Sequence, residues 1–237
     1  MTVITLSRQL GGRGREVADE VARVLSLRLI DAEAINRAAQ QAGVPERALA
    51  ELEHEGEQSL ASQVLKAFET MPVLSPGAEV RPAQAEASSL TLPFAGLFSA
   101  TLSPLSASFE RYVHVVGLVV QGLAREGNVL VVGRGSQVLL RKHPGALHVQ
   151  IVAPVPDRVK TVMVRYKLDK KAAESRVRAS DRSRADYLRR YHGVNWLDPT
   201  LYHLVINTGR VPVSAAVDLI VRAYQTAMTA GDTISGG

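Results

Sequence analysis

The chain has 237 residues, of which 46% are hydrophobic and 22% are charged, a composition typical of a globular protein that can bury a sizeable core. It contains no cysteine, which excludes disulfides, thiolate metal sites and a thiol nucleophile, and its six histidines show no spacing typical of metal ligands. The formal net charge of +5 favours polyanionic partners, and since no stretch resembles a signal peptide or a membrane span, we expect a cytoplasmic protein without a membrane partner.

The first sixteen residues predict a strand, a glycine-rich loop and the start of a helix. Val3 to Leu6 is a short β-branched run, and apolar residues recur at helical spacing from Val17 to Leu25, so a helix is expected to begin near Gly14. The glycines let several backbone N–H groups turn toward one ligand, and the helix N-terminus adds partial positive charge, which favours a phosphate site. A tight turn with solvated arginines is the alternative. The candidate phosphate-binding residues of this loop are Ser7, Arg8, Gly11, Gly12, Gly14 and Glu16.

The loop departs from the consensus P-loop motif, G-x-x-x-x-G-K-[ST]. When residues 11–16 are laid on the pattern G-x-G-K-x-[ST], Gly14 stands where the lysine is expected, and Glu16 takes the place of the magnesium-binding hydroxyl. Arg8, Arg13 and Arg15 supply fixed positive charge beside the glycines. Because arginine holds phosphate oxygens with two hydrogen bonds at once, these residues could replace part of the lysine's role.

Strands and helices alternate through the rest of the chain. The predicted strands comprise residues 28–31, 129–132, 146–152 and 204–207. The predicted helices comprise residues 32–42, 46–57, 59–69, 109–125, 155–167, 170–190 and 213–227, with a frayed tail beyond Thr229. Prolines interrupt every periodic pattern from residue 71 to 108. That stretch is therefore expected to be a loop, either packed against a second subunit in a homodimer or lying on the surface.

This alternation is typical of an α/β protein with a three-layer, doubly wound parallel sheet. Ligands bind such sheets at the carboxyl ends of the strands, so the residues just past the strands should line one cleft. These residues are 7–15, Asp31, 133–135, 153–154 and 207–208.

Two further groups of charged residues could act in that cleft. Asp31, Arg37 and Arg134 are candidates for binding an acceptor substrate, because their segments lie just past strands. The arginine-rich segment 158–190 could be a lid that folds over polyphosphate and neutralises the charge that develops during phosphoryl transfer. A solvated helix face or a nucleic-acid patch is the alternative, although few aromatic residues interleave with the charges, which disfavours single-stranded nucleic acid.

Four motifs in order resemble those of one family. Residues 4–18 are similar to the pattern I-[ST]-[IL]-S-R-[QE]-x-G-S-G-G-R-E-[IV]-[AG]. Residues 31–37 are similar to D-T-G-A-M-Y-R, and residues 133–138 to G-R-D-x-G-T without its acidic residue. Asp181-Arg182-Ser183-Arg184 resembles a lid cluster, followed by an aromatic-rich stretch at 187–198. In this order and spacing the chain resembles the cytidylate kinase-like P-loop family, in a divergent branch.

The resemblance implies a nucleoside-monophosphate-kinase-like fold in which residues 1–237 form one domain, 44–108 a helical insertion and 155–198 the arginine-rich lid. It also implies transfer of the ATP γ-phosphoryl group to a nucleoside monophosphate, CMP or dCMP, with ATP and Mg²⁺ as cofactors. We assign no metal ligand to the chain itself. The candidate catalytic residues are Arg13, Arg15, Arg182 and Arg184. Arg158 joins the phosphate-binding set, and the candidate acceptor-binding residues are Asp31, Arg37, Arg134 and Asp181.

Three other functions stay open at this point. The altered loop would suit a P-loop protein that has lost catalysis and senses a nucleotide or another phosphorylated ligand. A kinase of the same fold could act on a different small acceptor. A nucleic-acid binder that uses the basic segment is the weakest of the three.

Overall fold

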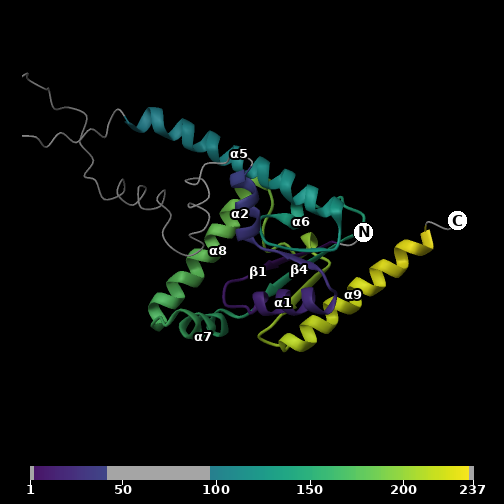
Figure 1. Cartoon of the computed structure of the whole chain (residues 1–237). Helices are drawn as coiled ribbons and strands as arrows, with labels where there is room; N and C mark the ends of the chain where they lie inside the picture. Colours follow the sequence, from purple (N-terminus) through teal and green to yellow (C-terminus); the bar gives the residue numbers. More distant parts are fainter. Residues whose placement is uncertain (1–2, 42–96, 235–237) are drawn as a thin grey trace, which may run out of the picture.

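The computed structural model describes residues 3–41 and 97–234. Within these ranges, five parallel strands form one sheet in the order β2-β3-β1-β4-β5 (Figure 1). The strands are β1 (Val3–Arg8), β2 (Arg28–Ile30), β3 (Val129–Val132), β4 (Ala146–Val152) and β5 (Leu204–Asn207). The helices are α1 (Gly14–Val24), α2 (Ala32–Gln41), α5 (Leu97–Glu126), α6 (Ser136–Leu139), α7 (Val155–Tyr166), α8 (Lys170–His192) and α9 (Val213–Ile234), with a 3₁₀ helix η1 (Pro199–Leu201).

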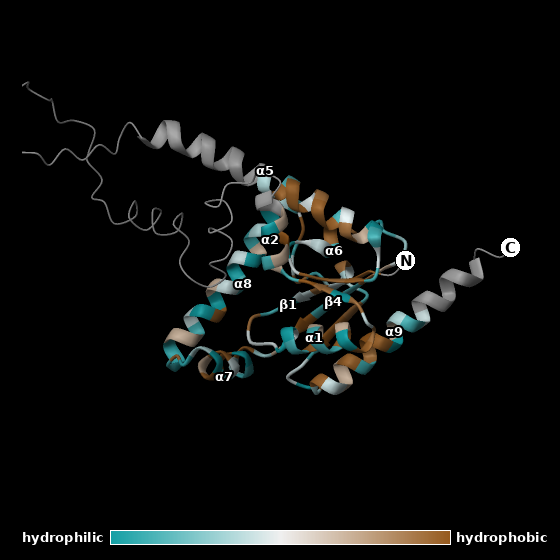
Figure 2. Ribbon diagram, viewed as in Figure 1, coloured by the Kyte–Doolittle hydropathy of each residue, from teal (hydrophilic) through white to brown (hydrophobic). Residues whose placement is uncertain are grey.

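The sheet lies between two layers of helices, which confirms the predicted three-layer, doubly wound architecture (Figure 1). Helices α1 and α9 pack on one face through Val17, Val21 and Ile220, against Ile4 and Leu6 of β1. The other face is covered by apolar residues of α2 and α5, which are Ile35, Tyr112, Val116 and Val120. Figure 2 shows the resulting apolar centre, in which the strands and the inner faces of these helices are brown.

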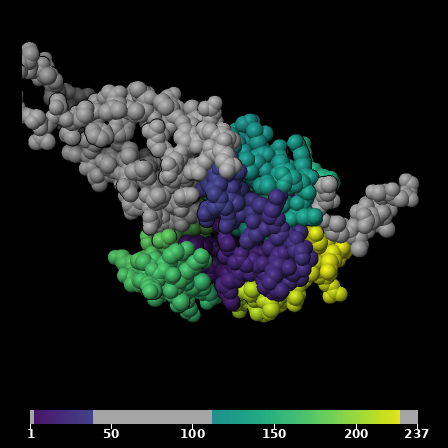
Figure 3. All heavy atoms as spheres, viewed as in Figure 1, coloured from purple at the N-terminus to yellow at the C-terminus, as the bar shows by residue number. Residues whose placement is uncertain are grey.

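Helices α7 and α8 contact each other and diverge from a short turn (Figure 1), and together they form a lobe beside the sheet (Figure 3). A small apolar cluster joins them, made by Val159 and Val162 from α7 and by Ala173 and Val177 from α8. The side chain of Asp169 caps α8 by accepting a hydrogen bond from the Ala172 backbone N–H, at 2.7 Å. Most other residues of α8 are polar, and within the described ranges its buried Leu188 packs with Val138 and Trp196.

The structure differs from the sequence-based expectations at several ends of elements. Helix α5 begins at Leu97 and includes Pro104, although prolines were expected to keep residues 71–108 in a loop. Proline removes one backbone donor, and the thirty-residue helix continues through that position. Helix α9 continues to Ile234, beyond the predicted end, because no proline stops it. The short helix α6 was not predicted.

Most of the predicted insertion lies outside the described residues. This applies to the helices expected at 46–57 and 59–69, and to the part of the 71–108 loop before Leu97. Among the described helices, none has a stretch long and apolar enough to cross a membrane.

Candidate functional site

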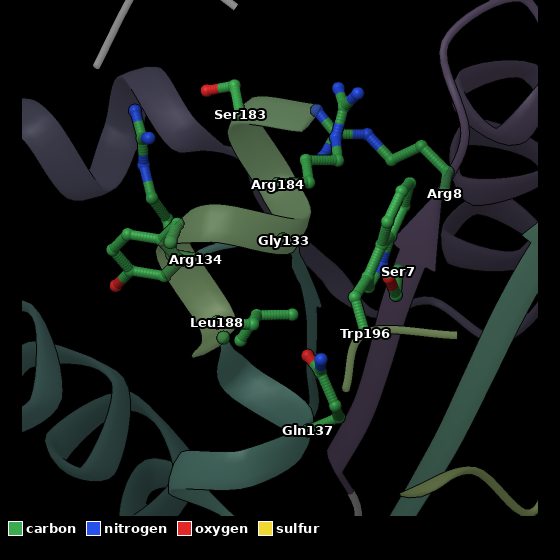
Figure 4. Close-up of a pocket in the computed structure, with 11 residues that line it drawn as sticks. Ser7, Arg8, Gly133, Arg134, Gln137, Ser183, Arg184, Leu188 and Trp196 are labelled. Carbon is green, nitrogen blue, oxygen red and sulfur yellow. Dashed lines mark hydrogen bonds between the residues drawn. The ribbon is translucent and has the colours of Figure 1, made fainter. Parts of the chain in front are cut away.

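A cavity opens where the carboxyl ends of β1 and β3 meet the C-terminal half of α8 (Figure 4). Ser7 and Arg8 end strand β1, and the Gly133–Gly135 turn follows β3. The lobe contributes one side of the cavity from α8, and Trp196 from the following loop closes another. The lining residues are Ser7, Arg8, Gly133, Arg134, Gly135, Gln137, Ser183, Arg184, Tyr187, Leu188 and Trp196.

Three arginines from three different elements line this cavity. Arg8 comes from the end of β1, Arg134 from the turn after β3, and Arg184 from α8. In Figure 4 the side chains of Arg8 and Arg184 point toward one another above Trp196. Among the described residues, no carboxylate lines the cavity. Like charges in a half-buried site repel by roughly 1 to 4 kcal/mol per pair, so this arrangement favours binding of an anion.

The buried side-chain amide of Asn36 holds Arg134 in place. The Asn36 side chain is only 3% exposed, and its Oδ1 accepts hydrogen bonds from Arg134 Nη2 at 3.2 Å and from the Tyr112 hydroxyl at 3.1 Å. Asn36 belongs to α2 and Tyr112 to α5, so both helices of one layer orient this guanidinium. The Nε of Arg134 is buried and has no hydrogen-bond partner among the described residues.

Other buried polar atoms around the cavity also lack partners within the described ranges. They are Ser136 Oγ, the Tyr187 hydroxyl and His192 Nε2. Burial raises the pKa of Tyr187, which keeps this hydroxyl protonated and able to donate. Burial also lowers the pKa of His192, which favours the neutral ring near neutral pH. Unsatisfied polar atoms at the rim of a cationic cavity are suited to bind a polar ligand or ordered water.

The floor of the cavity is a fully paired polar network. Trp196 is buried, and its indole N–H donates to Ser7 Oγ at 2.9 Å. Gln150 Nε2 and the Tyr202 hydroxyl both donate to the Trp196 carbonyl oxygen, at 3.1 and 2.9 Å. Gln137 donates in turn to the Tyr202 hydroxyl at 3.3 Å. Because these residues fix one another, the Trp196 ring is a rigid wall beside Arg184.

The glycine-rich loop lies next to this cavity, between β1 and α1. Gln9 ties it to the neighbouring strand end, because its Oε1 accepts from the Ala153 backbone N–H at 3.0 Å. Thr208, just past β5, donates its hydroxyl hydrogen to the Gly12 carbonyl oxygen at 2.8 Å. At the start of α1, Arg13 makes no side-chain capping hydrogen bond. The N–H groups of the first helical turn are therefore available to an anion.

The three loop arginines point to different places. Only Arg8 lines the cavity. Arg13 forms an exposed ion pair with Glu16 at 2.7 Å, and Arg15 pairs with Asp19 at 2.9 Å and with Asp31 at 3.0 Å. Burial tends to raise the pKa of Asp31, but hydrogen bonds from the Ala34 backbone N–H and from Arg15 outweigh it, so the pKa is lowered.

The remaining candidates are also distributed unevenly. Arg158 is 2% exposed and donates to both carboxylate oxygens of Asp181, at 2.9 and 2.8 Å, so these two residues hold α7 to α8. Arg182 is exposed and does not line the cavity. Arg37 pairs with Glu33 on the surface of α2, at 2.7 Å. Of the predicted site residues, the structure brings together Ser7, Arg8, Arg134 and Arg184.

Several cavity residues were not predicted to belong to the site. Gln137, Ser183, Leu188, Tyr187 and Trp196 line it, and Asn36 supports it. Trp196 is the single tryptophan of the chain and lies in the aromatic-rich stretch after the lid, which was a usable signal. The amides carried no signal of this kind, because a buried asparagine or glutamine is recognisable only from its contacts.

The described residues do not form a metal site of their own. No group of three or more His, Asp or Glu side chains lies close enough together within these ranges to hold a metal ion. The Glu16 carboxylate is engaged by the Arg13 guanidinium, at 2.7 Å. The loop and the first turn of α1 do suit the phosphates of ATP, and Mg²⁺ would arrive as part of that substrate.

Comparisons with known proteins agree with this architecture. A model of the cytidylate kinase-like family matches residues 3–210. A solved structure of an uncharacterized protein from Eubacterium ventriosum ATCC 27560 is similar, with a TM-score of 0.63 and 18% identity over 95% of this chain and 98% of that one. A shikimate kinase from Acinetobacter baumannii, solved with shikimate, gives a TM-score of 0.46 and 14% identity over 95% and 94%.

One curated protein is similar over part of the chain. A uronate isomerase of Corynebacterium glutamicum is 33% identical over 99 residues, which are 42% of this chain and 19% of that protein. The chain therefore spans about a fifth of the length of that relative.

Proposed function

Because this chain belongs to the cytidylate kinase-like family, we propose that it is a phosphotransferase that moves the γ-phosphoryl group of ATP to a nucleoside monophosphate, most simply CMP or dCMP. The observation that carries the proposal is the convergence of Arg8, Arg134 and Arg184 on one cavity without a lining carboxylate in the described ranges. Phosphoryl transfer depends mainly on positioning and on neutralising charge, and arginines from several elements are suited to both.

The position of the cavity supports different roles for the residues on its two sides. The glycine-rich loop and the first turn of α1 would hold the phosphates of ATP. Arg134, oriented by Asn36, would bind the phosphate of the acceptor. Arg184 would reach the transferred group from α8, so movement of the lobe could open and close the site.

Thermal-shift screening followed by a phosphotransfer assay tests this function. The full chain with Mg²⁺ is screened against ATP and against CMP, dCMP, UMP, AMP and GMP. We expect stabilisation by ATP and by at least one monophosphate, because a ligand that binds the folded state raises its stability. We also expect conversion of that monophosphate to the diphosphate. The proposed reaction is wrong if no monophosphate is converted while the protein is folded and binds ATP.

A second function is favoured by the loop itself. With the lysine of G-x-x-x-x-G-K-[ST] laid on Gly14, the hydroxyl residue of the motif falls on Arg15 and not on Glu16, so both groups that assist catalysis in consensus P-loops are missing. A nucleotide sensor would bind ATP or a monophosphate and turn neither over. The same screen separates the two functions, because a sensor gives thermal stabilisation without product. Conversion of a different small acceptor would identify a kinase of another specificity.

A further inference from the structure

The side chain of Arg8 passes between two glycines that belong to different elements. A Cβ atom added at Gly14, the first residue of α1, would lie 2.5 Å from Arg8 Cβ and 3.1 Å from Arg8 Cγ. A Cβ atom added at Gly133, just past β3, would lie 2.7 Å from Arg8 Nη1. All three separations are shorter than an ordinary van der Waals contact between heavy atoms. The stem of Arg8 therefore occupies the space that a side chain at position 14 would need.

The consensus P-loop places residues at these two positions in the opposite way. When the lysine of G-x-x-x-x-G-K-[ST] is laid on position 14, the first glycine of the motif falls on position 8. This chain has arginine at 8 and glycine at 14. Since a Cβ at position 14 would be directed at the stem of residue 8, only one of the two positions can carry a long side chain.

We propose that Arg8 is the phosphate-binding cation of this loop and replaces the P-loop lysine from the end of β1. Its stem passes Gly14, and its guanidinium lies beside Gly133 at the cavity that Arg134 and Arg184 also line. The loop thus keeps a positive charge, but the side chain that carries it belongs to the end of β1 and not to the start of α1. A planar guanidinium can contact two phosphate oxygens at once, whereas an ammonium acts as a point charge. This inference rests on the proposed nucleotide-binding function.

The test exchanges the two residues and measures binding of MgATP and of inorganic triphosphate by calorimetry. Arg8→Ala is expected to weaken both by about tenfold or more, because a charge-assisted hydrogen bond contributes roughly 1.5 to 3 kcal/mol. Gly14→Lys alone is expected to weaken binding too, since the new side chain collides with Arg8. The double variant Arg8→Gly with Gly14→Lys restores the consensus arrangement and should bind at least about fivefold more tightly than either Arg8→Gly or Gly14→Lys.

Two matched controls separate this effect from damage to the fold. Arg23→Ala removes an arginine that is 71% exposed on α1 and should leave binding unchanged. Gly14→Ala should weaken triphosphate binding by displacing Arg8, whereas Gly122→Ala, which meets no atom within 4 Å, should not. Thermal unfolding without ligand shows which variants are folded. If the double variant is not folded, the comparison of Gly14→Ala with Gly122→Ala still decides the test.

The outcomes distinguish this inference from the function on which it rests. In one outcome, the wild-type chain binds MgATP and triphosphate with dissociation constants that Arg8→Ala matches within about twofold. In that case the role proposed for Arg8 is wrong and the proposed function stands. A double variant that is folded and binds no better than Arg8→Gly also overturns it. If the folded wild-type chain binds neither ligand, both proposals fail.

Discussion

Asn36 does not line the cavity itself, but it holds the side chain of Arg134, which does. Its Oδ1 accepts from Arg134 Nη2 and from the Tyr112 hydroxyl in a buried position. Asn36→Ala removes a shared acceptor of two donors, and we expect it to lower the free energy of unfolding by about 2 kcal/mol. We also expect a higher KM for the acceptor, because Arg134 loses its orientation, while the affinity for ATP is retained. Urea unfolding and steady-state kinetics measure the two effects.

A merely structural role for Asn36 would give a different pattern. In that case KM for the acceptor would match the wild type at temperatures where the variant is folded. Asn195→Ala provides the control, since Asn195 is exposed and its side chain accepts a local hydrogen bond from the Leu197 backbone N–H, at 3.1 Å. Loss of ATP affinity in Asn36→Ala would contradict the assignment of Arg134 to the acceptor side.

The Arg158–Asp181 pair couples two helices to the glycine-rich loop. The guanidinium is buried and engages both Asp181 oxygens, and its Nη1 also lies 3.5 Å from the Leu10 carbonyl oxygen. Asp181→Ala would leave a buried arginine without its carboxylate. Since the Asp181 side chain is 28% exposed, water relieves part of this cost, and we expect a loss of about 2 kcal/mol in the free energy of unfolding.

A second carboxylate on the same helix tests that argument. Asp186 pairs with Arg189 at 2.7 Å, but both side chains are mostly exposed, so Asp186→Ala should cost less than about 0.5 kcal/mol. Hydrogen exchange should also be faster in the loop around Leu10 in Asp181→Ala and not in Asp186→Ala. Equal stability losses in the two variants would show that the burial of Arg158 does not decide the effect.

Helices and strands were predictable from this sequence to a greater extent than the directions of side chains. All five described strands coincide with strands predicted from the sequence, and β3, which is buried along its whole length, is wholly apolar. The three loop arginines look alike in the sequence, yet Arg8 lines the cavity while Arg13 and Arg15 pair with nearby carboxylates. The pairs of Arg13 and Arg15 with Glu16 and Asp19 are local, whereas the placement of Arg8 beside Gly133, just past β3, is a distant contact that local patterns do not contain.

Asp181 shows the same dependence on distant contacts. Its place in an arginine-rich cluster suggested contact with the acceptor, which stays a prediction, and its carboxylate engages Arg158 from the preceding helix. The partner lies 23 positions away in the sequence, and the turn between α7 and α8 brings the two together. Sequence order therefore predicted the edge of the sheet at which the cavity lies, and the three-dimensional contacts decided which arginines line it.

A polar band crosses the middle of the sheet on the face that leads to the cavity. Thr5 and Ser7 of β1 lie beside His148 and Gln150 of β4, and all four are buried. Thr5 Oγ1 lies 2.8 Å from His148 Nδ1, and the His148 ring stacks on His203 with centroids 5.0 Å apart. Ser7 and Gln150 both bond to Trp196, so the band connects the centre of the sheet with the cavity floor.

This band makes the stability of the whole molecule depend on pH. Burial, with a smaller contribution from His203, lowers the pKa of His148 to about 4, from the usual value of 6.5 for histidine. Between these values the unfolded chain binds a proton that the folded chain does not, so stability is greatest above pH 6.5 and falls as the pH is lowered toward 4. At 1.36 kcal/mol per pKa unit the full loss is about 3 kcal/mol.

Urea unfolding at pH 4.5, 5.5 and 7.5 measures this dependence. The variant His148→Gln keeps a polar side chain beside Thr5 but cannot take up the proton, so its free energy of unfolding should fall less steeply with decreasing pH. The lowered pKa of His192 contributes in the same direction in both proteins, and it cancels when the two slopes are subtracted. Identical slopes for the wild type and His148→Gln would mean that the buried imidazole is not the group that titrates. A difference that extends well above pH 6.5 would contradict the assignment as well, because both states of His148 are neutral there.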